Sequence, residues 1–131
     1  MPTVNVLAVL ASAISMFVIG GVWYSPMLFE RQWLAANGAG PELMARGNRI
    51  FIFGLAFVAS LLIAMNLGFL VGTLPLGAAV GYAIAAGFGF AGLGLAVLAL
   101  FERRPLTYWL INAGYLTVSF AVMGVIFGLW K

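Results

Sequence analysis

The chain alternates between long apolar runs and short polar connections. Four runs without a charged side chain cover about 4–24, 50–71, 76–101 and 106–130. Each reaches the length of about 20 apolar residues that a helix needs to cross the hydrocarbon core of a bilayer. Backbone polar groups in lipid must be satisfied internally, so each run is expected to be helical. The pattern therefore predicts a single all-α domain over 1–131, a polytopic membrane protein with four transmembrane helices.

The first connection carries helix signals of its own. Ser25 is a favoured N-cap residue, Pro26 is favoured at the first helical position, and Gly38 suits the left-handed end of a helix. We therefore expect a short helix over about 26–37. Its apolar face favours a helix that lies in the headgroup layer, although a polar loop with one chance tryptophan fits the same residues. That face consists of Phe29, Trp33 and Ala36.

Basic residues are distributed unevenly between the two sides that four spans imply. The side of the first and third connections carries five arginines, whereas the other side carries only Lys131 and the terminal amine. Because Arg and Lys are enriched in cytoplasmic loops, we expect both connections in the cytoplasm and both termini on the non-cytoplasmic side. The five arginines are Arg31, Arg46, Arg49, Arg103 and Arg104.

Composition agrees with a lipid-exposed protein and argues against several functions. Hydrophobic residues make up 65% of the 131 residues and charged residues 7%, against about 25% charged in a soluble domain. The absence of Cys and His excludes disulfides, thiolate metal sites and the usual haem ligand. We therefore expect no metal and no cofactor. We also expect no nucleic-acid partner, because the cations flank the apolar runs and do not cluster on one solvated face.

The four spans contain no Asp, Glu, Lys or Arg. Such side chains usually mark an ion path or a proton relay in a membrane, and without them general acid–base catalysis is left with tyrosine alone. We therefore expect neither a proton-coupled transporter nor an enzyme, and we identify no catalytic residue.

The fourth span carries the clearest polar pattern. Its polar side chains are spaced by four, three and four residues, which places them on one helical face. They could line a wet groove or a ligand site, or they could hydrogen-bond neighbouring helices, as such residues commonly do in membranes. Asn66, Asn5, Ser12 and Ser15 present the same choice more weakly. The stripe consists of Tyr108, Asn112, Tyr115 and Ser119.

Small residues repeat at helical spacing in the third and fourth spans. Gly77, Gly81, Ala85 and Gly89 recur every four residues, and Gly124 and Gly128 form a second pair. Small faces allow helix backbones to approach closely, which favours packing in lipid. The pattern fits packing within one chain as well as an interface between chains.

Two segments of the chain form distinctive motifs. The first reads GVWYSPMLF from Gly21, and the second reads FERRPL from Phe101 and continues as LINAGY from Leu110. Together they resemble the bacterial domain-of-unknown-function 1761 family of small four-span membrane proteins. Members often have a histidine where this chain has Leu116. The resemblance implies a bacterial inner-membrane location and a distinctive surface, which the predicted topology places at the cytoplasmic edge. Arg103 or Arg104 would lie near this surface, where it could form a specific anion site; we favour the alternative that the arginines only hold topology and contact lipid phosphates. That surface would consist of Trp23, Tyr24, Ser25, Pro26, Asn112 and Tyr115.

Two function hypotheses follow from the sequence. The first is a non-enzymatic accessory or scaffold subunit of a larger membrane complex, because packing faces are plentiful and reactive side chains are absent. The second is a small oligomeric pore or carrier for a neutral or lipid-like solute, lined by the polar stripe. Both place the chain in the lipid bilayer as part of a homo- or hetero-oligomer with other membrane proteins.

Overall fold

The computed structural model describes residues 5–40, 42 and 47–130 and consists there of helices and connecting turns. Val4, Arg46 and Lys131, which entered the predictions above, lie outside the described residues. The helices are α1 (Val6–Trp23), α2 (Glu30–Ala36), α3 (Arg49–Val71), α4 (Leu76–Ala86), the π-helix η2 (Gly87–Gly92), α5 (Leu93–Phe101) and α6 (Leu106–Leu129).

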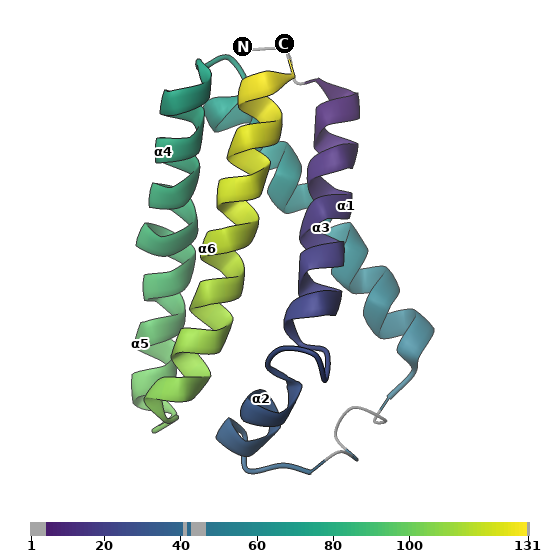
Figure 1. Ribbon diagram of the computed structural model, residues 1–131, viewed down its shortest axis with the longest axis vertical. Coiled ribbons are helices and arrows are strands. Elements are labelled where there is room, and N and C mark those ends of the chain that lie inside the picture. Colours follow the sequence, from purple (N-terminus) through teal and green to yellow (C-terminus); the bar gives the residue numbers. More distant parts are fainter. Residues whose placement is uncertain (1–4, 41, 43–46, 131) are drawn as a thin grey trace.

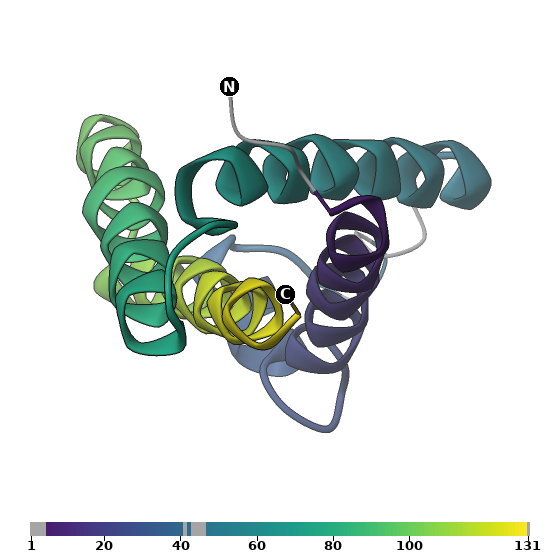
Figure 2. The same cartoon turned by 90° about the horizontal axis from the view of Figure 1, so that it is seen from above.

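The four predicted spans are confirmed as helices long and apolar enough to cross a membrane. The third span is the continuous run α4–η2–α5. Figure 1 shows α6 between α1 and α4–α5, with the start of α1, the α3–α4 turn and the end of α6 at the same end of the bundle. Seen from above in Figure 2, α3 runs along one edge of the bundle, beside α1. The fold is thus an all-α antiparallel bundle in which α6 is central.

Several helix starts have identifiable caps. The Asn5 Oδ1 accepts a hydrogen bond from the Ala8 backbone N–H at 3.1 Å, so Asn5 caps α1 and does not bind another span. The Asn48 Oδ1 accepts from Ile50 and Phe51 at 3.0 and 3.2 Å and starts α3 one residue before the predicted boundary. Pro75 and Pro105 precede α4 and α6, where a missing N–H costs nothing.

The short helix of the first connection begins later than predicted. α2 starts at Glu30 and not at Pro26. The intervening residues form a tight turn, in which the Phe29 N–H bonds to the Trp23 carbonyl and the Glu30 N–H bonds to the Ser25 carbonyl. These bonds span six and five residues, so the helical ladder cannot start before Glu30. The predicted end is confirmed, since Gly38 has a φ of +64° directly after the C-cap residue Asn37.

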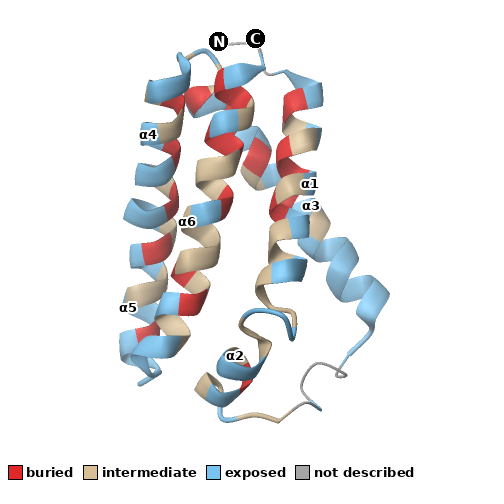
Figure 3. Cartoon of the chain, viewed as in Figure 1, coloured by how far each residue is buried: buried red, intermediate tan, exposed pale blue. Residues whose placement is uncertain are grey.

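The core of the bundle is narrow and built mainly from small and flexible side chains. Figure 3 shows that buried residues follow the inward faces of the helices, while the first half of α3 is exposed. Ile50 and Phe90 are 86% and 82% exposed, which a water-soluble surface would not tolerate on this scale. The exposed apolar surface therefore fits a hydrocarbon environment. The core residues are Ala8, Ala13, Met16, Ala64, Leu67, Val71, Ala79, Ala83, Met123 and Phe127.

Candidate functional site

The two family-like segments meet where α1 ends and α6 begins. The Trp23 Nε1–H donates to the Ile111 carbonyl at 2.8 Å, and the Tyr24 hydroxyl donates to Asn112 Oδ1 at 2.5 Å. One turn further along α6, the Tyr115 hydroxyl donates to the Met16 carbonyl at 3.1 Å. We call these residues the α1–α6 cluster, comprising Trp23, Tyr24, Ile111, Asn112, Tyr115 and Met16. Each of its three hydrogen bonds joins α6 to α1 or to the residue that follows it.

Two glycines make room for the aromatic rings of this cluster. A methyl group at Gly20 would lie 3.1 Å from the Tyr115 hydroxyl oxygen, and one at Gly114 would lie 3.0 Å from Trp23 Cζ2. Both distances are shorter than an ordinary carbon contact. Reasoning from the sequence missed this role, because each ring-to-glycine contact joins positions about 90 residues apart.

The turn after α1 and the helix α2 close the cluster from one end. The Phe29 ring lies 5.0 Å from that of Trp23, and the Trp33 ring lies 5.8 Å from that of Tyr24 in an edge arrangement. Ser25 holds this turn, since its hydroxyl donates to the Val22 carbonyl and accepts from the Met27 N–H. Pro26 lies exposed in the same turn. The predicted surface residues of the WYSP segment thus divide into two that contact α6 and two that shape the turn.

The far end of the polar stripe is buried inside the bundle. Ser119 follows Tyr115 by one turn, and Ser12 precedes Met16 by one turn on the antiparallel α1. Both serines are 0% exposed, and neither hydroxyl has a hydrogen-bond partner within the described part of the chain. Asn112 and Tyr115 therefore bond to the residue after α1 and to α1 itself, and Ser119 faces the interior of the bundle.

Tyr108, the fourth residue of the stripe, has a different neighbour. The Arg104 guanidinium lies 5.1 Å from the centre of its ring, a cation–π arrangement. The same guanidinium donates to Asn37 Oδ1 at 3.2 Å and lies 3.4 Å from a Glu102 oxygen, so it fastens the end of α2 to the α5–α6 turn. Arg103 is exposed, has a φ of +60° and donates to the Leu100 carbonyl.

The two sets of small residues have opposite surroundings: one lies in the interface between α4 and α6, and the other faces away from it. A methyl group at Gly124 would lie 2.7 Å from Ala83 Cβ, and one at Gly128 would lie 2.8 Å from Leu76 Cα, so both glycines pack against α4. In contrast, methyl groups at Gly77, Gly81 and Gly89 would meet no described atom within 4 Å. Ala85, which completes this row, is exposed. We call these four residues the α4 row, although Gly89 lies in η2; its three glycines have open space beside them among the described residues.

The π-helix supplies a further link between the third and fourth spans. Gly87 is buried against α6, where a methyl group would lie 2.6 Å from Phe120 Cβ. The Gly92 carbonyl accepts a hydrogen bond from the Trp109 Nε1–H at 2.7 Å. No feature of the sequence predicted this link, since an extra residue in a helical turn has no simple signature.

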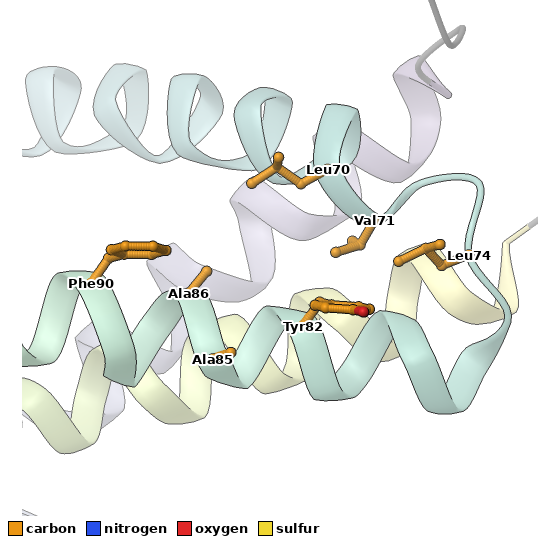
Figure 4. A pocket seen from close by; sticks show the side chains of 7 residues that line it. All are labelled: Leu70, Val71, Leu74, Tyr82, Ala85, Ala86 and Phe90. Atoms are coloured by element: carbon orange, nitrogen blue, oxygen red, sulfur yellow. The ribbon is translucent and has the colours of Figure 1, made fainter.

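A cavity of about 440 Å³ opens between α3 and α4–η2 (Figure 4). Leu70 and Val71 of α3 face Tyr82, Ala86 and Phe90 across it. Its walls are apolar, apart from the tyrosine hydroxyl, so its chemistry suits a hydrocarbon chain. No group of three or more metal-ligating His, Cys, Asp or Glu side chains occurs within the described ranges.

The structure is that of a small multi-pass membrane protein in which α6 contacts each of the other three spans. The family profile described as "Protein of unknown function (DUF1761)" matches residues 7–128. The chain therefore belongs to this family, which confirms the resemblance of its two motifs. No curated protein and no solved structure matches the chain.

Proposed function

We propose that the protein is a non-enzymatic accessory or scaffold subunit of a larger complex in the bacterial inner membrane. The observation that carries the proposal is the inward use of the polar groups of α6. Asn112 and Tyr115 bond to Tyr24 and to the Met16 carbonyl, and Ser119 is fully buried. Side chains that hold helices together in this way are not free to line a solute path.

The row on α4 supports a contact with another membrane helix. Small residues at an exposed position allow a neighbouring backbone to approach closely, and close packing is a main source of helix association in lipid. The row has open space above Gly77, Gly81 and Gly89 as far as the described residues extend. A partner helix can therefore lie on α4 without any rearrangement of this chain.

The cavity between α3 and α4–η2 favours one form of the alternative function. Its apolar lining suits a lipid-like solute better than a polar one. A carrier of this kind would use the cavity between α3 and α4–η2 and not the polar stripe of α6.

The test of the proposed function is purification of the tagged chain from its native membrane in mild detergent, followed by identification of co-purifying proteins. We expect a reproducible partner, lost in Gly81→Leu, which fills the outward row. Gly54→Leu is the matched control, because a methyl group there also meets no described atom within 4 Å but lies on α3. A chain that purifies alone, or a partner retained equally by both variants, would contradict the proposal.

We further propose that the cytoplasmic side is the side of Arg31, Arg49, Arg103 and Arg104, as the positive-inside rule predicts. The chain has no cysteine, so a single introduced thiol reports one position. In intact cells a membrane-impermeant thiol reagent should label Thr73→Cys at the α3–α4 turn and leave Glu102→Cys unlabelled. The reverse pattern would overturn this orientation.

A further inference from the structure

α3 carries two rows of residues on opposite faces. The inner row of Ser60, Ala64, Leu67 and Val71 is buried in the bundle. The inner row is spaced by four, three and four residues; the outer row continues the same heptad pattern with spacings of four, three, four and three, and all of its members are exposed. We call it the outer seam, and it consists of Leu55, Ala59, Leu62, Asn66 and Phe69.

Figure 2 places α3 at the edge of the bundle, with its inner face toward the other helices. Leu55, Leu62 and Phe69 are 53%, 52% and 37% exposed, although each lies within a span. A heptad of this kind is the pattern with which two helices pack side by side in a left-handed crossing, the commonest arrangement in membrane bundles.

Asn66 is the polar member of the outer seam. It lies five residues before the end of α3, about 7.5 Å along the helix axis, and its side chain has no hydrogen-bond partner in the described part of the chain. A primary amide facing hydrocarbon loses the hydrogen bonds that water would give it. The free energy of this exposed amide falls when another membrane-embedded group supplies a donor and an acceptor.

A second copy of the chain supplies both groups at once. An amide has a donor, Nδ2–H, and an acceptor, Oδ1, so two Asn66 side chains can satisfy each other across a two-fold axis. Copies inserted with the same orientation have parallel α3 helices, which brings equivalent positions together at such an axis. A single asparagine within an apolar heptad is also the arrangement that fixes register and oligomeric state in paired helices.

We infer that the protein forms a homodimer through the outer seam of α3, with the Asn66 amides of the two copies hydrogen-bonded to each other. This inference goes beyond the proposed function, because it concerns contact between copies and uses α3. The row on α4, which the proposed partner would use, is on a different helix.

The test uses copies labelled with donor and acceptor fluorophores and reconstituted together in vesicles of phosphatidylethanolamine and phosphatidylglycerol. Energy transfer is measured against the protein-to-lipid ratio. We expect dimers for the unaltered chain, a dissociation constant raised about tenfold in Asn66→Leu by the loss of two interhelical hydrogen bonds, and a smaller increase in Asn66→Gln. Met65→Leu is the matched control, since Met65 is exposed but lies outside the seam, and it should match the unaltered chain.

Thiol crosslinking gives an independent measurement. Leu62→Cys should form a disulfide-linked dimer on oxidation, and Met65→Cys should not. Energy transfer in Gly81→Leu should equal that of the unaltered chain, which separates this inference from the hetero-partner proposed for α4. A monomer at every protein-to-lipid ratio, equal dissociation constants for Asn66→Leu and the unaltered chain, or Leu62→Cys crosslinks only to another protein would overturn the homodimer.

Discussion

The two faces of α6 contact their neighbouring helices by different means. Toward α1, long aromatic side chains cross the gap and donate hydrogen bonds to Asn112 and to the Ile111 and Met16 carbonyls. Toward α4, Gly124 and Gly128 bring the helices so close that a methyl group would meet backbone atoms within about 3 Å. Lipid offers no hydrophobic driving force between helices, so helix association must come from other contacts. The α1 face uses hydrogen bonds for this, and the α4 face uses close packing.

The two faces of α6 should differ in how well they tolerate substitution. A hydrogen bond between membrane helices contributes about 0.6 kcal/mol on average, so the α1 face distributes its stability over several modest contacts. The α4 face depends on the close approach of the two helices at glycine, so one added side chain would push α4 and α6 apart. We therefore expect the glycine face to be the more sensitive of the two.

The largest effect is expected for Gly124→Leu. The added side chain would begin 2.7 Å from Ala83 Cβ and 3.0 Å from the Ala79 carbonyl oxygen, so α4 must move, and we expect a loss of about 3 kcal/mol in the free energy of unfolding. Denaturation in lipid–detergent bicelles measures it. Gly81→Leu on the opposite face of α4 should change the same quantity by less than about 0.5 kcal/mol, and equal losses would refute the comparison.

A smaller effect is expected where a glycine meets an aromatic ring. Gly20→Ala would place a methyl group 3.1 Å from the Tyr115 hydroxyl oxygen and should cost about 1 kcal/mol. Tyr115→Phe alone loses the bond to Met16, at about 0.6 kcal/mol. Because Phe also removes the crowded oxygen, the double variant should lose less than the sum of the two. Strict additivity of the unfolding free energies would show that the two residues do not contact each other.

The smallest effect is expected at Tyr24 and Asn112. A double-mutant cycle of Tyr24→Phe and Asn112→Ala should give a coupling of about 0.6 kcal/mol, because the cycle isolates one hydrogen bond. Tyr82→Phe serves as a control, since Tyr82 is 64% exposed on α4, and it should show no coupling to Asn112. A coupling below about 0.2 kcal/mol would show that the Tyr24–Asn112 hydrogen bond does not contribute to stability.

Much of the fold could be predicted from the sequence because each span carries its own length and apolarity. The spans and the Gly38 stop depend on neighbouring residues alone. The predicted start of α2 was wrong because the observed start is set by the turn in which Phe29 packs on Trp23. Capping residues in the sequence do not predict such a contact. The π-helix and the position of α3 along one edge of the bundle likewise depend on packing between segments.

The candidate site was predictable in its residues but not in its use. The spacing of Asn112, Tyr115 and Ser119 gives one helical face, yet it does not say whether that face meets water or α1. The small residues posed the same difficulty, since Gly81 and Gly124 have similar surroundings in the sequence but opposite surroundings in space. Only the relative placement of α1, α4 and α6 separates these alternatives.

Asn112, Tyr115 and Ser119 of α6 face the interior of the bundle and do not line a water-filled path. Reaction of Ser119→Cys with a water-soluble thiol reagent in reconstituted vesicles tests this arrangement, because Ser119 is 0% exposed and the unaltered chain has no cysteine. Thr73→Cys, at the exposed α3–α4 turn, gives the rate for an accessible thiol. We expect no labelling of Ser119→Cys over the time in which Thr73→Cys reacts completely. Labelling at a comparable rate would contradict it and favour a wet path along α6.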